Sequence, residues 1–367
     1  MSDATKYDKW LAESGPAALV IREWLMPVEG SDGVLFPATY AAGGDFLGGY
    51  NIDGDPNGKN ICLIDSVGAQ ANRIEPIFSK PEYAGLVPKV VIKAGEKEVN
   101  LLEAGHRAGD AIVRCSGLQK ELHDAFNEVM RGNAEPLAKI APTSLVFGVW
   151  DSRDTQVKLP RLVASTIRAL DVRPLTRSAN YLVQQQVDYV KDGLLPEPAS
   201  KTEKDEYSVR GFQNALATKT HGGVIATGGI RRDATLSLAA LRLLTVGKDE
   251  KKTLALKRYI LGLALTAFTA TPLGYLRQGC LLVINPDKSR EFVEVYADGK
   301  RVACALTHDD AKAFATATVG PKAFEIGKDR TENFDKKLAE ADVKGEGEGG
   351  GKKKKAAKKT ESTAGGL

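Results

Sequence analysis

Cysteine and histidine are scarce in this chain. Its 367 residues include only four of each, and no two cysteines form a CxxC pair. A zinc site read from sequence needs closely spaced ligands, and a disulfide-stabilised secreted fold needs many cysteines. The sequence therefore predicts no metal site, no disulfide framework and reduced thiols, as in a cytoplasm.

An export signal and a membrane span are also missing. The first fifteen residues, MSDATKYDKWLAESG, lack a basic stretch followed by an apolar one. Tyr259–Leu276 is free of charge for 18 residues, but Gly262, Pro272 and Gly274 interrupt it. We expect a core helix there, and a cytoplasmic protein with no membrane partner.

Signatures of common enzymes are absent as well. The chain has no GxSxG elbow and no HExxH motif. Gly43–Gly49 has the glycine spacing of a phosphate loop, but Gly49-Tyr50 stands where such a loop needs Lys-Ser/Thr. Three aspartates lie beside arginines and could bind a metal ion or transfer a proton: Asp151, Asp154 and Asp233. Ion pairing or loop capping is the simpler role for them. The sequence predicts no catalytic residue and no cofactor.

Charge is present, but it is unevenly distributed. Apolar residues make up 43% and charged residues 27%, which are values of a globular protein. Six lysines and three glutamates in residues 345–367 account for +3 of the net charge of +4. Any nucleic-acid site must therefore be a local basic stripe on a nearly neutral body.

The most informative segment is Leu145–Tyr181, LVFGVWDSRDTQVKLPRLVASTIRALDVRPLTRSANY. It holds six cationic residues against three aspartates, and five of the six are arginines. The planar guanidinium pairs with phosphate through two hydrogen bonds and stacks on bases. The segment is typical of a groove for a nucleic-acid backbone, while a solvated face of ion pairs is the simpler alternative.

Two other segments combine glycine with basic residues. THGGVIATGGIRRD places Gly228 and Gly229 before Arg231 and Arg232, where backbone amides could approach a phosphate or could form a plain hairpin turn. DSVGAQANRIE opens a helix whose first turn would attract anions.

The pattern of apolar residues predicts an α+β protein with an antiparallel sheet, because strands and helices do not alternate strictly. Expected strands are Ala17–Leu25, Asn60–Ile64, Val87–Lys93, Glu98–Leu102, Ala111–Cys115, Leu145–Trp150, Gly279–Ile284 and Glu291–Ala297. One helix is expected to begin after Ser66, its N-cap. Three more are expected over Gln119–Met130, Ala234–Leu244 and Leu254–Thr271.

Four segments in a fixed order resemble a known family: DSVGAQANRIE, GHRAGDAIVR, LVFGVWDSRDTQVKLPRLVASTIRA with LTRSANY, and GGIRRDATLSLAALRLL. Together they look like the backbone subunit of the type I-G (formerly I-U) CRISPR effector complex, the Csb-one branch of the Cas-seven group of RAMP proteins. The resemblance spans about Leu19 to Val283.

This resemblance implies a modified RRM-like (ferredoxin-like) core with large insertions, forming a hand-shaped subunit. Residues 1–330 would be one RNA-binding body, with a loop-rich insertion at 27–59 and a candidate thumb at 194–227. Residues 331–367 would be a disordered, lysine-rich tail. The chain has no aromatic triplet of the RRM type, so base reading on the sheet is not expected.

The resemblance also implies partners and contact residues. The partners would be CRISPR RNA, target DNA paired to the guide, further copies of the chain in a helical filament, and other Cascade subunits. Binding would be non-catalytic and independent of sequence, because guide–target pairing carries specificity. The residues expected to contact the RNA backbone are Arg22, Asn72, Arg73, Arg107, Arg153, Lys158, Arg161, Arg231 and Arg232.

Two alternatives stay open. Related backbone subunits cut target RNA with a loop aspartate, so the chain could be a metal-dependent RNA endonuclease of the RAMP family. It could also be an unrelated enzyme whose basic pocket binds a small anionic substrate.

Overall fold

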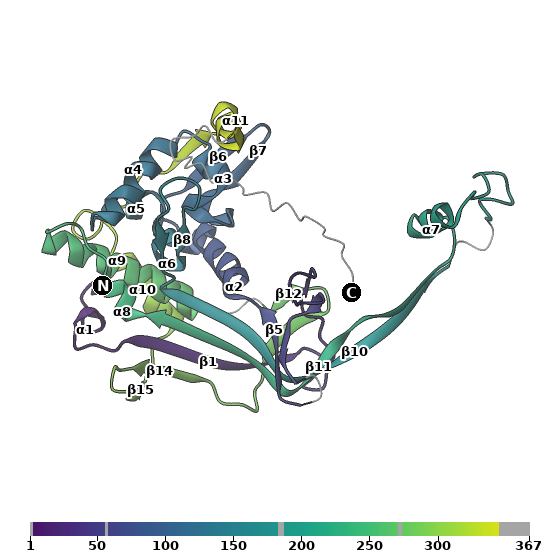
Figure 1. The fold of residues 1–367 in the computed structure, drawn as a ribbon. Coiled ribbons are helices and arrows are strands. Elements are labelled where there is room, and N and C mark those ends of the chain that lie inside the picture. The colour runs from purple at the N-terminus through teal and green to yellow at the C-terminus, as the bar shows by residue number, and fades with distance from the viewer. Residues whose placement is uncertain (1–2, 56–57, 183–186, 271–273, 345–367) are drawn as a thin grey trace, which may run out of the picture.

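One long antiparallel sheet organises the molecule (Figure 1). A computed structural model describes residues 3–55, 58–182, 187–270 and 274–344. The sheet has nine strands, and seven follow one path: β12 (Tyr275–Arg277), β13 (Cys280–Ile284), β1 (Ala18–Pro27), β11 (Ala215–Ser237), β10 (Val163–Tyr181), β5 (Asn60–Asp65) and β4 (Ile52–Gly54). β14 (Glu291–Val295) pairs with β1, and β15 (Arg301–Ala303) pairs with β14. The predicted α+β class with an antiparallel sheet is confirmed, and the arrangement is compatible with a modified RRM-like fold.

Helices cover one face of this sheet. Leu19 and Ile21 of β1 and Leu236 of β11 point into a core that also contains residues of α6 (Pro142–Phe147), α8 (Leu238–Arg242), α9 (Glu250–Thr269) and α10 (His308–Ala317). The helix α9 is apolar on all sides because it lies inside this layer. At Gly262 a Cβ atom would come 2.7 Å from the backbone of Ala315, so only glycine allows α9 and α10 to pack this closely.

The sheet curls so that β12, at one end of the strand order, contacts β5, near the other end. The Arg277 guanidinium on β12 donates to the carbonyl oxygen of Ile64 on β5 at 2.9 Å. Arg73, on α2 (Val67–Ile74), donates to the carbonyl oxygen of Leu276 at 2.9 Å, and both arginines pair with Asp65. A second apolar core fills the curl and includes Leu25, Cys62, Ile167 and Cys280.

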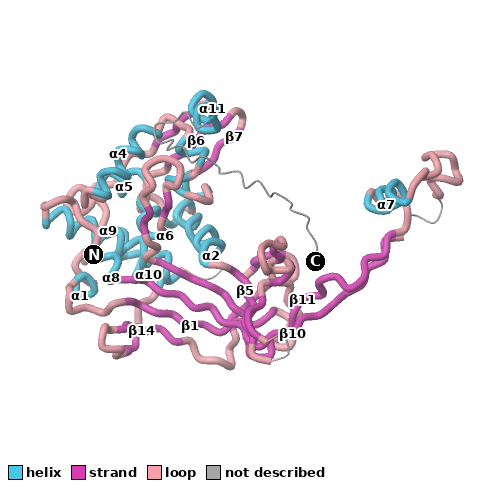
Figure 2. Tube along the Cα trace, in the orientation of Figure 1, coloured by secondary structure: helices cyan, strands magenta, loops and turns pink. Residues whose placement is uncertain are grey.

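A smaller helical unit lies beside the central sheet (Figure 2). It contains α3 (Ala111–Arg114), α4 (Gln119–Met130), α5 (Glu135–Ile140) and α11 (Lys336–Lys344), around the sheet of β16 (Arg330–Asn333), β6 (Val90–Ala94) and β7 (Lys97–Asn100). Further short elements are α1 (Asp8–Leu11), α7 (Lys201–Val209), the pair β2 (Thr39–Tyr40) and β3 (Gly49–Tyr50), and the pair β8 (Val149–Trp150) and β9 (Lys158–Leu159). Four 3-10 helices are also present: Glu75–Ser79, Pro81–Tyr83, Leu101–Glu103 and Arg107–Gly109. None of the helices in the described ranges has the length and apolar character that crossing a membrane requires.

Several predicted elements are right in type, and one is right to the residue. The helix Gln119–Met130 has the predicted bounds, and Ser66 accepts a hydrogen bond from Ala69 as the N-cap of α2. The predicted strands Val87–Lys93 and Glu98–Leu102 are present as β6 and β7, which pair with each other. The predicted helix Leu254–Thr271 is α9, which starts earlier because Asp249 caps it; residues 271–273 lie outside the described residues.

Two predicted strands are wrong. Leu145–Trp150 is mainly the end of α6, which starts at Pro142 and stops at Gly148, whose φ of 74° suits glycine. Each residue of α6 is buried, so the apolar run has no helical period to read. The segment Ala111–Cys115 is helix α3 because the Asp110 carboxylate caps it through the amide of Ile112.

Two predicted boundaries also change. The helix expected over Ala234–Leu244 is shorter, since β11 continues to Ser237 and that side chain then caps α8. The unstructured tail expected from Thr331 begins too early, because β16 pairs in parallel with β6 and α11 follows it. The lysine-rich part, residues 345–367, lies outside the described residues.

Candidate nucleic-acid interface

Among the described residues, no helical layer covers the second face of the central sheet. Along β1 the side chains alternate: Leu19, Ile21 and Glu23 are buried, while Arg22 is exposed and Trp24 is half-buried on the other face. Because antiparallel partners share a face, the register carries this alternation to β11, β10 and β14. We call this side the open face.

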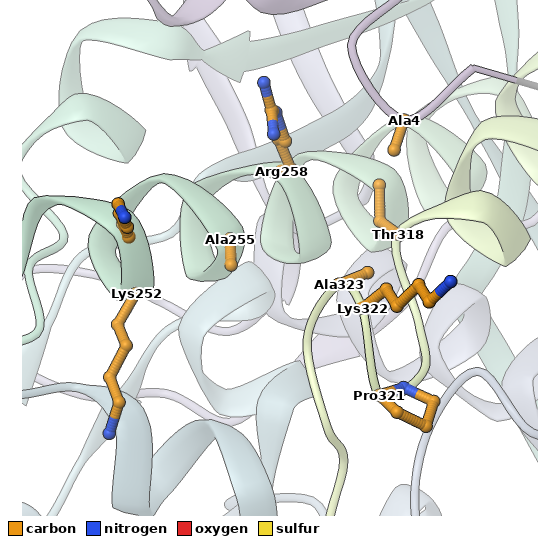
Figure 3. A pocket seen from close by; sticks show the side chains of 9 residues that line it. Ala4, Lys252, Ala255, Arg258, Thr318, Pro321, Lys322 and Ala323 are labelled. Atoms are coloured by element: carbon orange, nitrogen blue, oxygen red, sulfur yellow. The ribbon is translucent and has the colours of Figure 1, made fainter.

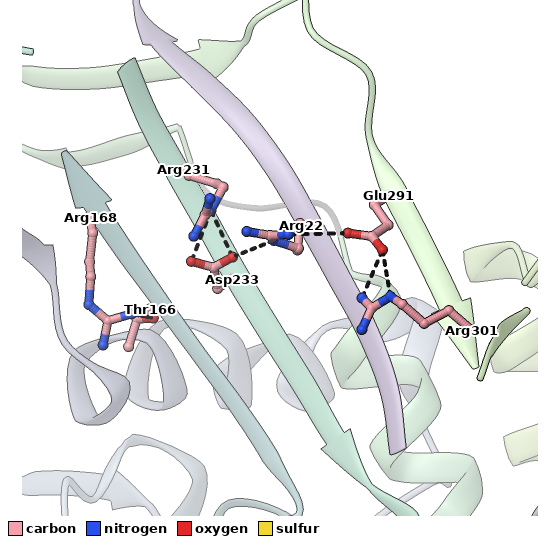
Figure 4. Close-up of polar contacts among 7 residues, drawn as sticks. All are labelled: Arg22, Thr166, Arg168, Arg231, Asp233, Glu291 and Arg301. Atoms are coloured by element: carbon pink, nitrogen blue, oxygen red, sulfur yellow. Dashed lines mark hydrogen bonds and ion pairs between the residues drawn. The ribbon is translucent and has the colours of Figure 1, made fainter. Parts of the chain in front are cut away.

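Four arginines form a row across the open face (Figure 4). Arg168 on β10 lies opposite Arg231 on β11, and Arg22 on β1 and Arg301 on β15 extend the row. Each comes from a different strand, so the sheet register alone brings them together.

Two carboxylates lie within the row. Asp233 is 2.9 Å from Arg231 and 3.5 Å from Arg22, and Glu291 is 3.7 Å from Arg22 and 2.7 Å from Arg301. Arg168 instead donates to the Thr166 hydroxyl at 2.8 Å. The row thus holds two positive charges in excess, on side chains that keep contact with water.

Trp24 lies beside this row. The Lys288 ammonium is 4.0 Å from the centre of its ring, and the Arg231 guanidinium carbon is 5.5 Å from it. A Cβ atom on Gly229 would come within 3.2 Å of the indole, so the glycine lets the ring lie against β11. Both glycines that the sequence places before Arg231 therefore belong to the strand β11, and Gly229 accommodates Trp24.

A second basic cluster lies on the hairpin of β8 and β9. Arg153, Lys158 and Arg161 are exposed there, and Lys158 lies 5.5 Å above the Trp150 ring. No carboxylate among the described residues comes within ion-pair distance of these three cations. The hairpin therefore carries uncompensated positive charge, as the sequence indicated for this segment.

Two arginines expected at the surface are buried. Arg232 is 2% exposed and pairs with Glu23 at 2.9 Å on the helix-covered face. Arg107 is 4% exposed and lies 2.6 Å from Glu75, and its guanidinium donates to the carbonyl oxygen of Gly148. Desolvation lowers the pKa of both guanidinium groups, and the carboxylates of Glu23 and Glu75 oppose this shift. The expected contact with an RNA backbone does not fit either position.

Asn72 and Arg73 have structural partners as well. Arg73 is held by Asp65 and by the carbonyl oxygen of Leu276, so its place is in the seam that closes the curl. Asn72 is exposed, but its side-chain oxygen accepts from Arg107 at 3.2 Å. The predicted residues thus divide into the open face, the β8–β9 hairpin and a structural group, instead of forming one continuous track.

The three aspartates considered for catalysis all have partners. Asp151 is buried and accepts from the amide and hydroxyl of Thr155 at 2.8 and 2.7 Å. Asp154 lies 2.8 Å from His123, and Asp233 belongs to the arginine row. Within the described part of the chain, no three potential metal ligands of the His, Cys, Asp or Glu type gather.

A long hairpin projects from the body (Figure 1). It is formed by the outer halves of β10 and β11, with α7 near its end. Arg173 and Arg177 are exposed on its β10 arm, and Arg177 lies 6.0 Å from the Phe36 ring. The segment expected to be the thumb, residues 194–227, contains α7 and residues 215–227, which belong to one arm of this hairpin, whereas the other arm, in β10, lies before that segment.

A cavity of about 330 Å³ on the helical side is also lined by cations. Its lining includes Lys252, Arg258 and Lys322, but these side chains point in different directions (Figure 3). Arg258 is also paired with Asp8. The cations therefore do not converge on one bound anion.

Sequence reasoning missed Arg168, Arg301 and Trp24 as members of the open face. Arg168 stood in the segment singled out above, and its period-two spacing from Thr166 would have put both on one face of a strand. No local signal could select Arg301, because its position depends on β14 pairing with β1.

A comparison with protein families matches part of the chain. Residues 19–174 match the model of the family described as CRISPR-associated protein GSU0053. Over these residues, which are less than half of the chain, the protein is similar to that CRISPR-associated family. The match contains Arg22, the whole β8–β9 hairpin and Arg168, and it ends inside β10. No curated protein matches the chain.

Proposed function

We propose that this chain is a CRISPR-associated protein, namely the non-catalytic backbone subunit that coats CRISPR RNA in a type I-G (formerly I-U) Cascade-like complex. The observation that carries the proposal is the open face, where four arginines against two carboxylates lie in a row. In an RRM-like fold this is the face without helices, where RNA binds.

The chemistry of the row supports binding that does not depend on base sequence. Guanidinium groups contact phosphate oxygens, which are identical at every nucleotide. The guide bases would stay available for pairing with target DNA, which would supply the specificity. The other partners are further copies of the chain in a filament and the remaining Cascade subunits, in the cytoplasm, with the β10–β11 hairpin as the thumb.

The state of the aspartates favours binding over cleavage. A metal-dependent RNA endonuclease needs carboxylates that are free to hold the ion. Asp151 is used by its own loop, and Asp233 is shared by two arginines. Incubating the protein with target RNA and Mg²⁺ or Mn²⁺ tests this point, and cleavage that is lost in Asp151→Ala, Asp154→Ala or Asp233→Ala would establish the enzyme instead.

The direct test replaces Arg168 and Arg231 together by alanine. RNA that co-purifies with the protein should be strongly reduced. In titrations with single-stranded RNA, the slope of log K against log salt should become shallower by about 0.7 per lost phosphate contact. Equal losses for unrelated RNA sequences are expected, because phosphates carry no sequence.

The matched control is Arg131→Ala with Arg330→Ala. These arginines pair with glutamates near α4, away from the central sheet. Unchanged RNA retention is expected for this pair. Equal losses in both double variants would mean that general charge, and not the open face, holds the RNA.

A further inference from the structure

Trp150 is an aromatic side chain that the fold leaves at the surface. It is 58% exposed, whereas Trp10 is 2% exposed within the core. Tryptophan is enriched where a protein surface meets a partner, because its ring offers a large apolar area together with a polar N–H group. The position of Trp150 on β8 is therefore a candidate contact for a partner.

The charges around Trp150 define what kind of partner fits. Lys158 is its cross-strand neighbour and lies 5.5 Å above the ring, and Arg153 and Arg161 are exposed on the same hairpin. The acidic residues of the hairpin turn away from this surface: Asp151 is buried and Asp154 bonds to His123. An aromatic ring surrounded by cations is complementary to a nucleobase with its flanking phosphates.

The hairpin holds the ring in place before any partner binds. The Asp151 amide donates to the carbonyl oxygen of Val157, the Gln156 amide donates to the carbonyl oxygen of Asp151, and the Asp151 carboxylate holds Thr155. On the other side, a Cβ on Gly109 would come 3.2 Å from the Trp150 carbonyl oxygen, so the loop before α3 packs directly on β8. A preformed platform loses little entropy on binding.

We infer that Trp150 is a stacking platform for one base of a single-stranded nucleic acid, and that Lys158, Arg153 and Arg161 hold the adjacent phosphates. This inference rests on the proposed function, and it adds a base-stacking contact to the phosphate contacts of the open face. The strand must be single, because the faces of paired bases in a duplex are already stacked. Stacking accepts any base, so binding stays independent of sequence.

The experiment measures the affinity of Trp150→Ala and Trp150→Phe for two oligonucleotides of equal length, one normal single-stranded RNA and one with abasic residues. Trp150→Ala should weaken binding of the normal strand about fivefold or more and should leave the salt slope unchanged. Trp150→Phe should restore most of the loss. On the abasic strand, the wild type and Trp150→Ala should bind equally.

Two controls accompany this test. Met130→Ala removes an exposed apolar side chain at the end of α4, away from the central sheet, and should not change the affinity. Lys158→Ala with Arg161→Ala should make the salt slope shallower on both strands, because these cations contact phosphates.

Three results would overturn the inference. One is an unchanged affinity of Trp150→Ala for the normal strand, and another is an equal loss on the abasic strand. The third is loss of self-association with RNA affinity intact, which would assign the ring to an interface between copies. A wild-type protein that binds no RNA gives a different result, since it refutes the proposed function itself.

Discussion

Arg231 and Arg232 are neighbours in the sequence, but their side chains lie on opposite faces of β11. Arg231 joins the row on the open face, and Arg232 is buried against Glu23. The same residue type therefore serves two purposes, one in water and one in the core. Removing one partner of a buried ion pair is costly because the other charge stays without compensation.

Glu23→Gln should therefore lower the free energy of unfolding by about 3–5 kcal/mol, because the buried Arg232 charge loses its carboxylate. Glu291→Gln, which removes an exposed carboxylate that also pairs with arginine, should cost less than about 1 kcal/mol. Urea denaturation of both variants measures this difference. Equal effects would show that the Glu23–Arg232 pair is not a structural requirement.

Glu75 makes the free energy of unfolding depend on pH. Burial raises the pKa of its carboxyl group to about 7, and the nearby Arg107 opposes this shift only in part. The folded state therefore keeps the proton at pH values where the unfolded state, with a pKa near 4.5, has lost it. The contribution of Glu75 to the stability of the fold is therefore complete below about pH 4.5 and is lost as the pH rises through about 7.

The prediction compares the wild type with Glu75→Gln, whose neutral side chain does not titrate. The stability of the wild type relative to this variant should decrease as the pH rises from about 4.5 to about 7 and should be constant above it. Urea unfolding at a series of pH values gives the difference. A constant difference over the whole window would mean that Glu75 stays charged in the fold.

At the scale of elements, amphipathic segments were predictable and buried ones were not. Gln119–Met130 has one apolar face and was located to the residue, because Leu122, Ala125 and Phe126 repeat at helical spacing and are buried. The segment 142–147 is buried on every side, so its apolar run did not distinguish helix from strand. Arg330–Asn333 has no apolar pattern of its own and is a strand only because β6 lies beside it.

The strand β16 also leads to a prediction about truncation. Ending the chain at residue 329 removes β16 and leaves the buried strand β6 without its parallel partner. It also removes the Arg114–Asp342 ion pair. We expect a loss of several kcal/mol, on the scale of exposing core side chains. Ending the chain at residue 344 should change the stability by less than about 0.5 kcal/mol. Thermal melts of both truncated proteins test this prediction. A large fall in melting temperature for the chain that ends at residue 344 would give residues 345–367 a structural role.

At the scale of the whole molecule, the position of charge matters more than its amount. The body outside residues 345–367 is nearly neutral, yet the open face and the β8–β9 hairpin both present excess positive charge. Arg73 and Arg232 are neutralised in ion pairs, one where the curled sheet closes and one in the core. Local excess on a nearly neutral body suits a protein that binds one polyanion along defined surfaces.

Asp233→Asn tests the row as a whole. Removing this carboxylate frees Arg22 and Arg231 for phosphate, so RNA affinity should rise by a factor of about two to ten at low salt, on the scale of a surface ion pair. Asp309→Asn removes an exposed charge on α10 and should have no such effect. Weaker binding by Asp233→Asn, or an equal rise in both variants, would place the RNA away from the row.

The sequence by itself determined the α+β class, the antiparallel sheet, most elements with an amphipathic pattern and the similarity of residues 19–174 to a CRISPR-associated family. These depend on local propensity, on side-chain periodicity and on segments whose order along the chain is visible without a fold. Only the tertiary structure decided which arginines face solvent. That choice depends on strand register, where a shift by one residue exchanges the faces, and on partners distant in sequence, such as Glu23 for Arg232 and Asp65 for Arg277.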